Sequence, residues 1–390
     1  MKTLIFSVLH FLTDGLCAFS MFAVFGGSEK WYLYVLLYDF AAFALQMLFG
    51  AVMDYLKSCM ARRGLSGLAR GEAENCFSLP EFCTLLGIFF TVAGAFLHPV
   101  ILGIGNALFH VGGGIGTIEE DRKKEKKGAL LGIFVAPGAL GLFLGTFFGK
   151  SVSGSRIYII MLLLAAVMLL SFLPLIIKKR PQGLSKEASP EGFIAAEERA
   201  PGASEISPET ASKTEPETDG KNSLNAGAVF FAAALCFLVV VLRSYIGMAV
   251  GFSWKEGFLL GMVCTLAVVL GKMAGGILSA KWGTLKVMTV SLILSALGYL
   301  FSDIPVCGVL ALFFFNMTMP ITLYLLVDHL REFPGFSFGL LTLALFLGFL
   351  PVYAGLSVAL PGKILGFSGS LLSLLLLIIS LRLLQRKGEA

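Results

Sequence analysis

The sequence predicts an all-α membrane protein with twelve transmembrane helices in two six-helix bundles. Three observations support this fold class: a hydrophobic composition, twelve apolar segments of membrane-spanning length, and one long polar segment that separates six of them from the other six. Hydrophobic residues make up 57% of the 390 residues and charged residues only 14%, whereas soluble domains carry about 25% charged residues. The chain has too few polar side chains to cover a water-facing surface, which excludes a large soluble enzyme.

A helix that crosses a bilayer needs about 20 apolar residues, and twelve segments of the sequence meet this requirement. Only helices and closed barrels pair all their backbone groups inside lipid, and these segments are too long for barrel strands. Pro99 and Pro334 fall where proline is favoured, in the first turn of a helix. The predicted helices cover residues 3–25, 31–56, 80–97, 99–117, 128–149, 156–177, 225–250, 256–280, 285–302, 304–327, 334–359 and 363–382.

The basic residues predict the orientation. An even number of spans puts both termini on one side, and most of the 30 lysines and arginines fall in the loops on that side. Two groups of them lie within residues 57–70 and 122–127. Because cytoplasmic loops are rich in lysine and arginine, we expect a multi-pass protein of the plasma (inner) membrane with both termini in the cytoplasm.

Residues 181–222 differ from the rest of the chain. They are rich in Pro, Glu, Ser and Thr and contain almost no large apolar side chains. Such a composition cannot bury enough surface to fold, so we expect a disordered cytoplasmic linker that acts as a passive tether. It would separate an N-terminal six-helix bundle, residues 1–180, from a C-terminal six-helix bundle, residues 223–390.

The two halves share a short pattern at the cytoplasmic end of a helix. Gly50 and Asp54 end the second predicted helix, and Gly276, Lys281 and Gly283 end the eighth. Both resemble the G-x-x-x-D-R/K-x-G signature of the major facilitator superfamily, although the first copy lacks the basic residue and the second lacks the acid. An acid at a helix end can bind the N-terminus of a neighbouring helix. We therefore expect these residues to form the inner gates.

Polar side chains within the apolar segments predict the functional site, because a charge at mid-bilayer costs ~2.5–3.5 kcal/mol. His10 and Asp14 lie one turn apart in the first predicted helix, Asn106 and His110 lie one turn apart in the fourth, and Arg243 lies in the seventh. Residues four apart share one helix face. We expect these five side chains to line a central, ionisable pocket that binds substrate and protons.

Each of these residues also has a structural interpretation. Asp14 and Arg243 could form an ion pair that only joins the two halves, or Arg243 could extend to the outer surface. His110 could be a neutral histidine bonded to a helix backbone. Lys272, in the eighth predicted helix, is expected to extend its amine to the inner surface rather than into the pocket.

Glycines at small-x-x-x-small spacing predict close helix packing in the fifth and eighth predicted helices. We expect these two helices to meet across the halves, where a smooth surface would permit a rocking motion; static packing is the alternative. Pro137 beside Gly138 is expected to bend the fifth helix. The glycines are Gly128, Gly132, Gly141, Gly145 and Gly149, then Gly257, Gly261, Gly271, Gly275 and Gly276.

No motif predicts an enzyme, a metal site or a cofactor. The seven cysteines include no C-x-x-C pair. Residues 335–339 match G-x-S-x-G, but they open an apolar helix rather than the strand–turn–helix that a nucleophile elbow needs. The net charge of +5 is spread over short loops, so we expect no nucleic-acid partner.

The stretch from Gly103 to His110, followed by a polar loop and then residues 128–134, resembles the fosmidomycin-resistance branch of the major facilitator superfamily. His10 with Asp14, and Arg243 followed by Ser244, fit the same branch. The resemblance implies a drug efflux antiporter, that is, proton-driven export of a small molecule. We also expect a monomer that needs no cofactor.

We therefore predict a secondary active transporter that works by alternating access. Asp14 would take up and release a proton as its surroundings change, and Arg243 could instead hold an anionic group of the substrate. His10, His110 and Asn106 would make further polar contacts. A nutrient uptake symporter or facilitator, and a non-transporting sensor or scaffold with the same fold, are the alternatives.

Overall fold

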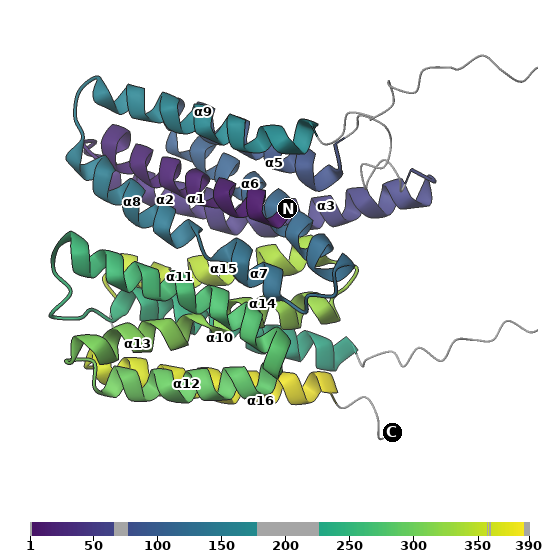
Figure 1. The fold of residues 1–390 in the computed structure, drawn as a ribbon, viewed down its shortest axis with the longest axis vertical. Coiled ribbons are helices and arrows are strands. Elements are labelled where there is room, and N and C mark those ends of the chain that lie inside the picture. Colours follow the sequence, from purple (N-terminus) through teal and green to yellow (C-terminus); the bar gives the residue numbers. More distant parts are fainter. Residues whose placement is uncertain (1, 66–76, 178–225, 357, 359, 386–390) are drawn as a thin grey trace, which may run out of the picture.

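The computed structural model describes residues 2–65, 77–177, 226–356, 358 and 360–385, and this part of the chain contains helices and no strands (Figure 1). The predicted linker, residues 181–222, lies outside the described residues. Within these residues, eleven helical segments are long and apolar enough to cross a membrane, and α12 (Thr284–Leu300) is apolar with 17 residues. The predicted all-α membrane fold is confirmed.

The N-terminal half contains six membrane-spanning segments, three of them interrupted. π-helical turns, η1 (Met21–Phe25) and η2 (Phe40–Ala44), occur in the first two segments. The fifth segment is divided into two helices at Ala136 and Pro137. The remaining elements are α1 (Lys2–Ser20), α2 (Trp31–Asp39), α3 (Leu45–Arg62), α5 (Leu79–Leu97), α6 (Pro99–Lys123), α7 (Ala129–Val135), α8 (Gly138–Ser151) and α9 (Arg156–Ile177).

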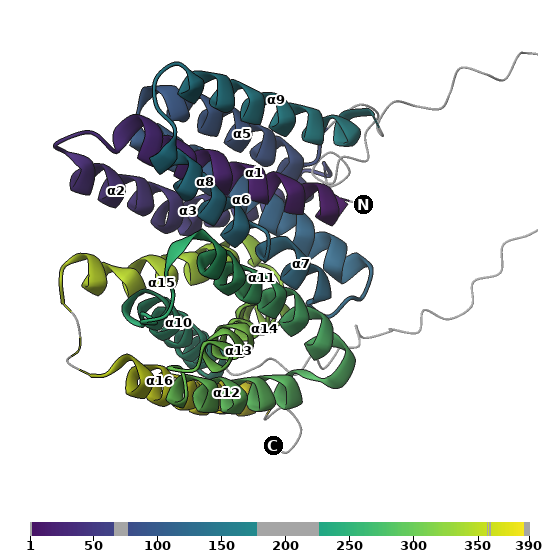
Figure 2. The same ribbon diagram turned by 60° about the vertical axis from the view of Figure 1, so that its left-hand side comes forward.

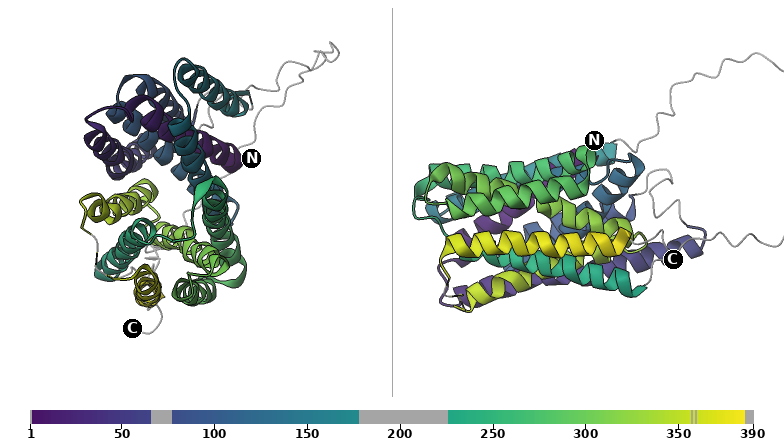
Figure 3. Two further views of the ribbon diagram at one scale, coloured as in Figure 1. Left: turned by 90° about the vertical axis from the view of Figure 1, so that its left-hand side faces the viewer. Right: turned by 90° about the horizontal axis from the view of Figure 1, so that it is seen from below.

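The C-terminal half repeats this plan with six segments, of which the fourth is interrupted at Met317. Figure 3 (left) looks along the helices and shows the two halves as separate groups. The elements besides α12 are α10 (Ala226–Ala249), α11 (Gly257–Trp282), α13 (Pro305–Asn316), α14 (Thr318–His329), α15 (Pro334–Tyr353) and α16 (Gly362–Gln385).

The start of α1 and the end of α16 lie at the same end of the molecule, which we call the terminal end (Figure 1); we call the other the opposite end. The halves meet mainly where α3 packs on α15 and where α7 and α8 pack on α11 (Figure 2). The fifth and eighth predicted helices therefore do meet across the halves, as expected.

Only some of the predicted glycines lie at this interface. A Cβ on Gly132 would come within 2.8 Å of the Lys272 carbonyl oxygen, so α7 and α11 cross there. In contrast, Gly141 faces the Phe11 carbonyl in α1, and Gly275 faces the Met317 carbonyl between α13 and α14. The expectation that both glycine series face the other half was wrong for these positions, because spacing shows that a face is smooth and not which helix covers it.

Gly141→Ala should lower the thermal unfolding temperature, because its Cβ would lie 2.1 Å from the Phe11 carbonyl oxygen and overpacking costs ~1–3 kcal/mol. Gly247→Ala is the matched control, since a Cβ on Gly247 in α10 meets no atom within 4 Å and alanine favours helix. Thermal unfolding in detergent checks both. Equal unfolding temperatures for the two variants would contradict the packing of α1 on α8.

Candidate functional site

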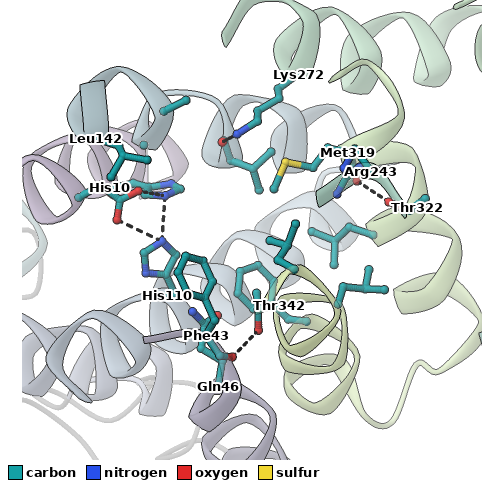
Figure 4. A pocket seen from close by; sticks show the side chains of 18 residues that line it. His10, Phe43, Gln46, His110, Leu142, Arg243, Lys272, Met319, Thr322 and Thr342 are labelled. Carbon is teal, nitrogen blue, oxygen red and sulfur yellow. Dashed lines mark hydrogen bonds and ion pairs between the residues drawn. The ribbon is translucent and has the colours of Figure 1, made fainter. Parts of the chain in front are cut away.

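A cavity of about 200 Å³ lies between the two halves (Figure 4). Its walls come from the first, fourth and seventh segments, where polar side chains were expected, and also from the second, fifth, eighth, tenth and eleventh. Drug-sized ligands usually occupy about 300–1,000 Å³, so this cavity suits a smaller molecule. The lining residues are His10, Asp14, Phe43, Gln46, His110, Val135, Gly138, Ala139, Leu142, Arg243, Lys272, Met319, Thr322, Leu323, Phe338, Leu341, Thr342 and Leu345.

His10, Asp14 and His110 form one cluster on the N-terminal side of the cavity (Figure 4). The Nε2 atoms of the two histidines lie 2.9 Å apart. Asp14 Oδ2 lies 3.2 Å from His10 Nε2, and Asp14 Oδ1 lies 3.7 Å from His110 Nε2. Sequence spacing predicted the pairing of His10 with Asp14; the contact with His110 depends on how α1 packs against α6.

Backbone carbonyls determine the histidine tautomers. His10 Nδ1 lies 2.7 Å from the Phe134 carbonyl oxygen, and His110 Nδ1 lies 2.8 Å from the Asn106 carbonyl oxygen. A carbonyl oxygen only accepts, so both Nδ1 atoms carry hydrogen. The two Nε2 atoms can then form a hydrogen bond only if one of them also carries hydrogen. That ring would be an imidazolium beside the Asp14 carboxylate, so the geometry offers a place for one shared proton.

Asn106 lies behind this cluster rather than on the cavity wall. It is 3% exposed, and its Nδ2 donates to Asp14 Oδ1 over 3.0 Å. Asn106 therefore orients the carboxylate from α6 and does not itself face the cavity. The expectation that it contacts substrate directly is not supported by this position.

The break between α7 and α8 supplies three backbone acceptors to the site. Proline has no N–H to continue the helix, and the carbonyls of residues 133–135 are instead bonded by side chains. Ser7 Oγ donates to the Ile133 oxygen over 3.2 Å, and Lys272 Nζ donates to the Val135 oxygen over 3.4 Å. Together with the contact of His10 Nδ1 with the Phe134 oxygen, these bonds connect the carbonyls at the break to side chains from both halves. Pro137 thus interrupts the fifth segment, where a bend was expected.

Gly138 follows the break and lies against the cluster. A Cβ there would come within 2.2 Å of His10 Nε2 and 2.4 Å of Asp14 Oδ2. Only glycine leaves room for the histidine and carboxylate at this position.

Arg243 lies on the C-terminal side of the cavity, across from the histidines (Figure 4). It is 7% exposed, and its Nη1 has no hydrogen-bond partner. Within the described residues it forms no ion pair with Asp14 or any other acid. The Arg243 side chain lines the cavity and does not extend to the outer surface, which was the other structural interpretation.

Lys272 and Gln46 also line the cavity, although neither was identified as a site residue from the sequence. Lys272 was expected to extend to the inner surface, but it reaches the cavity because α11 crosses α7 closely at Gly132. Gln46 is 1% exposed; its Nε2 donates to the Ala42 oxygen over 2.6 Å, and its Oε1 has no partner. A lysine and a glutamine within apolar segments could be noticed in the sequence, but the direction in which their side chains point depends on how the helices pack.

The same three side chains could also ligate a metal ion. The ligand atoms of His10, Asp14 and His110 all lie within 4.8 Å of one another, and both histidines bond a carbonyl through Nδ1, as metal-binding histidines do. No metal was predicted from the sequence. A proton shared by the Nε2 atoms would occupy the same position, so the geometry alone is compatible with either cation.

At the terminal end, Asp54 bridges the halves. Its two carboxylate oxygens accept hydrogen bonds from the backbone N–H groups of Gly335, over 3.0 Å, and Phe336, over 2.8 Å. These are orphan donors at the N-terminus of α15, where the helix dipole also favours an anion. Gly50 lies one turn earlier and crosses α15 closely, since a Cβ there would lie 2.1 Å from the Gly335 oxygen. This is the type of contact expected for an inner gate.

The second copy of the pattern behaves differently. Gly276 packs against Gly132 in α7, and Gly283 ends α11 with a φ of 92°. Lys281 is exposed and lies over the ring of Trp282. Arg122, which was not identified as a gate residue, bridges the halves instead: it donates to the oxygens of Val327, over 2.7 Å, and Arg331, over 3.0 Å. A cation near the C-terminus of α14 also suits the helix dipole.

At the opposite end the halves meet through aromatic side chains. Phe43 packs against Phe349, and Phe147 packs against Phe258 with ring centroids 4.5 Å apart. The Tyr32 hydroxyl donates to the Tyr353 oxygen. Charged contacts therefore join the terminal end, and mostly apolar contacts join the opposite end.

Asp54→Asn should shift the protein toward conformations that are open at the terminal end, because it removes a charge from the N-terminus of α15. Such a charge contributes about 1 kcal/mol, or about fivefold in population. Spin labels at the exposed positions Ser58 and Glu332 would report the distance distribution. Asp303→Asn is the control, since Asp303 pairs with Lys363 within the C-terminal half. An unchanged distribution in Asp54→Asn would contradict the gate assignment.

A model of the Major Facilitator Superfamily matches residues 78–353. Among solved structures, that of the transporter FucP in the outward conformation aligns over 100% of this chain and 99% of its own, with a TM-score of 0.57 and 12% identity. The human organic anion transporter TETRAN aligns over 97% and 98%, with a TM-score of 0.56 and 16% identity. No curated protein matches the sequence. The match of the family model over residues 78–353, more than half of the chain, shows that this protein belongs to the Major Facilitator Superfamily.

Proposed function

We propose that this protein is a proton-coupled secondary transporter that exports a small molecule by alternating access. The observation that carries the proposal is the cluster of His10, Asp14 and His110, which faces a cavity between the two halves and whose Nε2 atoms lie 2.9 Å apart, where a shared proton would fit. Polar groups are costly in lipid, so a cluster of this kind in a transporter fold favours a coupling role over a structural one.

Alternating access would use the different contacts at the two ends. At the terminal end, Asp54 and Arg122 bind helix ends of the other half through single side chains. At the opposite end, aromatic packing would have to separate. Rocking of the halves about the α7–α11 crossing, which is smooth at Gly132 and Gly276, would open one end as the other closes. We assign the terminal end to the cytoplasm, from the loop charges.

Proton coupling would involve the cluster as a unit rather than Asp14 alone. With a proton bound, the imidazolium and the carboxylate neutralise each other. When the proton leaves, two Nε2 lone pairs and a carboxylate face one another across 2.9–3.7 Å, an arrangement that favours separation of α1 from α6. Exchange of a proton for substrate at this cavity would give an antiporter.

The export direction rests on the resemblance to the fosmidomycin-resistance branch. A solved neighbour, the E. coli fucose:proton symporter FucP, aligns over 100% of this chain at 13% identity with a TM-score of 0.55, which shows the common fold and leaves uptake as the second candidate. A non-transporting sensor is disfavoured by the polar cavity and by the bridging contact of Asp54. We further propose a monomer in the plasma membrane.

Asp14→Asn and His110→Gln should each abolish substrate accumulation driven by a pH gradient while leaving facilitated exchange of substrate at equilibrium, because each disrupts the proton site. A thermal-shift screen of metabolites and drugs would first identify a substrate, and flux in proteoliposomes with imposed pH gradients of either sign would then be measured. His329→Gln is the control, since His329 lies at the terminal end of α14, where its Nδ1 bonds the Leu325 carbonyl oxygen of the same helix.

Retention of gradient-driven accumulation by a folded Asp14→Asn protein would contradict proton coupling at this cluster. The sign of the gradient that drives accumulation decides between export and uptake. A substrate flux through the wild-type protein that does not depend on the pH gradient would favour a facilitator.

A further inference from the structure

The charges on the cavity wall do not balance. Among the described side chains that line it, Asp14 is the only acid, whereas Arg243 and Lys272 are both cations. With neutral histidines the wall carries one excess positive charge, and with the cluster protonated it carries two. The excess is therefore positive in either protonation state of His10 and His110.

The two cations are also poorly paired. Arg243 is 7% exposed, and Nη1 has no partner. The one hydrogen bond of Lys272 Nζ goes to the Val135 carbonyl oxygen, over 3.4 Å. A buried ion normally has an opposite charge or several hydrogen bonds to compensate for lost water. Asp14 does not act as a counter-charge for Arg243 or Lys272, because both its carboxylate oxygens face the histidines and Asn106.

The rest of this wall is mostly apolar. Met319, Leu323, Phe338, Leu341 and Leu345 line it, and the hydroxyls of Thr322 and Thr342, which also line it, lie within hydrogen-bonding distance of backbone carbonyl oxygens. A ligand here would place a compact anionic group on Arg243 and an apolar body against these side chains. The guanidinium offers parallel N–H donors that suit a carboxylate, sulfonate or similar oxyanion.

We propose that Arg243 and Lys272 form an anion-binding subsite, and that the transported substrate is a small organic anion with an apolar body. The inference rests on the proposed function only in calling the ligand a transported one; the binding itself requires neither a gradient nor transport. Arg243 anchors the oxyanion, and Lys272 supplies a second positive charge from α11.

The subsite also gives the proton cluster a partner. The anion binds on the C-terminal wall and the proton on the N-terminal wall, so both ligands lie in one cavity between the halves (Figure 4). The anion neutralises charge on Arg243 and Lys272, and the proton neutralises the Asp14 carboxylate on the opposite wall.

Matched pairs of small aromatic probes test the subsite on the purified full-length chain in chloride-free buffer. Benzoate and benzenesulfonate carry the anion; benzamide and benzenesulfonamide have nearly the same shape without it, and benzylammonium reverses the charge. We expect both anions to raise the unfolding temperature and to bind at least tenfold more tightly than their neutral partners. Equal binding of anion and amide, tighter binding of benzylammonium, or no binding of either anion up to 10 mM would overturn the proposal.

Variants then locate the binding. Arg243→Gln should weaken anion binding by about 10- to 100-fold, the range for hydrogen bonds to charged groups, and should leave the binding of the neutral probes unchanged. Arg382→Gln removes an equal charge from an exposed position on α16 and should change neither. Lys272→Gln, matched with the exposed Lys286→Gln, should give a smaller loss.

The stability of the empty protein separates a ligand site from a structural ion pair. Because Arg243 is unpaired here, Arg243→Gln should unfold at the same or a higher temperature than the wild type without ligand. A large decrease, together with unchanged anion affinity, would assign Arg243 a structural role and overturn the proposal. Loss of gradient coupling with anion binding intact would instead refute only the proposed function, and gradient-driven transport without anion preference would refute only the subsite.

Discussion

The interruption of the fifth segment at Pro137 is the feature on which the site depends. In a continuous helix the backbone carbonyls accept hydrogen bonds from backbone N–H groups one turn later. At this break the carbonyls of residues 133–135 instead bond the side chains of Ser7, His10 and Lys272. Inside lipid such acceptors need partners, and here the partners come from both halves. The break therefore orients the His10 ring, and with it the contact to His110, and it brings a lysine of the other half to the cavity. Gly138 provides the room.

The contacts between the halves differ in chemistry along the membrane normal. Single charged side chains bind helix termini at one end, Asp54 on α15 and Arg122 near the end of α14, while aromatic rings pack at the other. Contacts of the first kind are few and geometrically specific, and contacts of the second kind can re-pack in several ways. The α7–α11 crossing between them is made by glycines. This distribution suits two rigid halves that tilt against each other.

The fold class and most of the cavity could be predicted from the sequence, because hydrophobic length and the cost of buried charge act locally along the chain. His10, Asp14, His110 and Arg243 all line the cavity for this reason. What depends on packing could not be predicted: that Asn106 lies behind Asp14, that Lys272 faces inward, that Arg122 takes the bridging role for which Lys281 was considered, and that Gly141 packs within its own half. Each of these is determined by which helix lies opposite a given face.

The central claim is that an aqueous cavity lies between the halves at mid-membrane. Leu142 and Leu163 test it most directly, since both are more than half exposed, at 55% and 60%, but Leu142 lines the cavity and Leu163 lies on α9 away from it. In a protein whose native cysteines are replaced, a charged, membrane-impermeant thiol reagent should modify Leu142→Cys in sealed vesicles and leave Leu163→Cys unmodified. Equal reaction of the two cysteines, or none at either, would contradict the account.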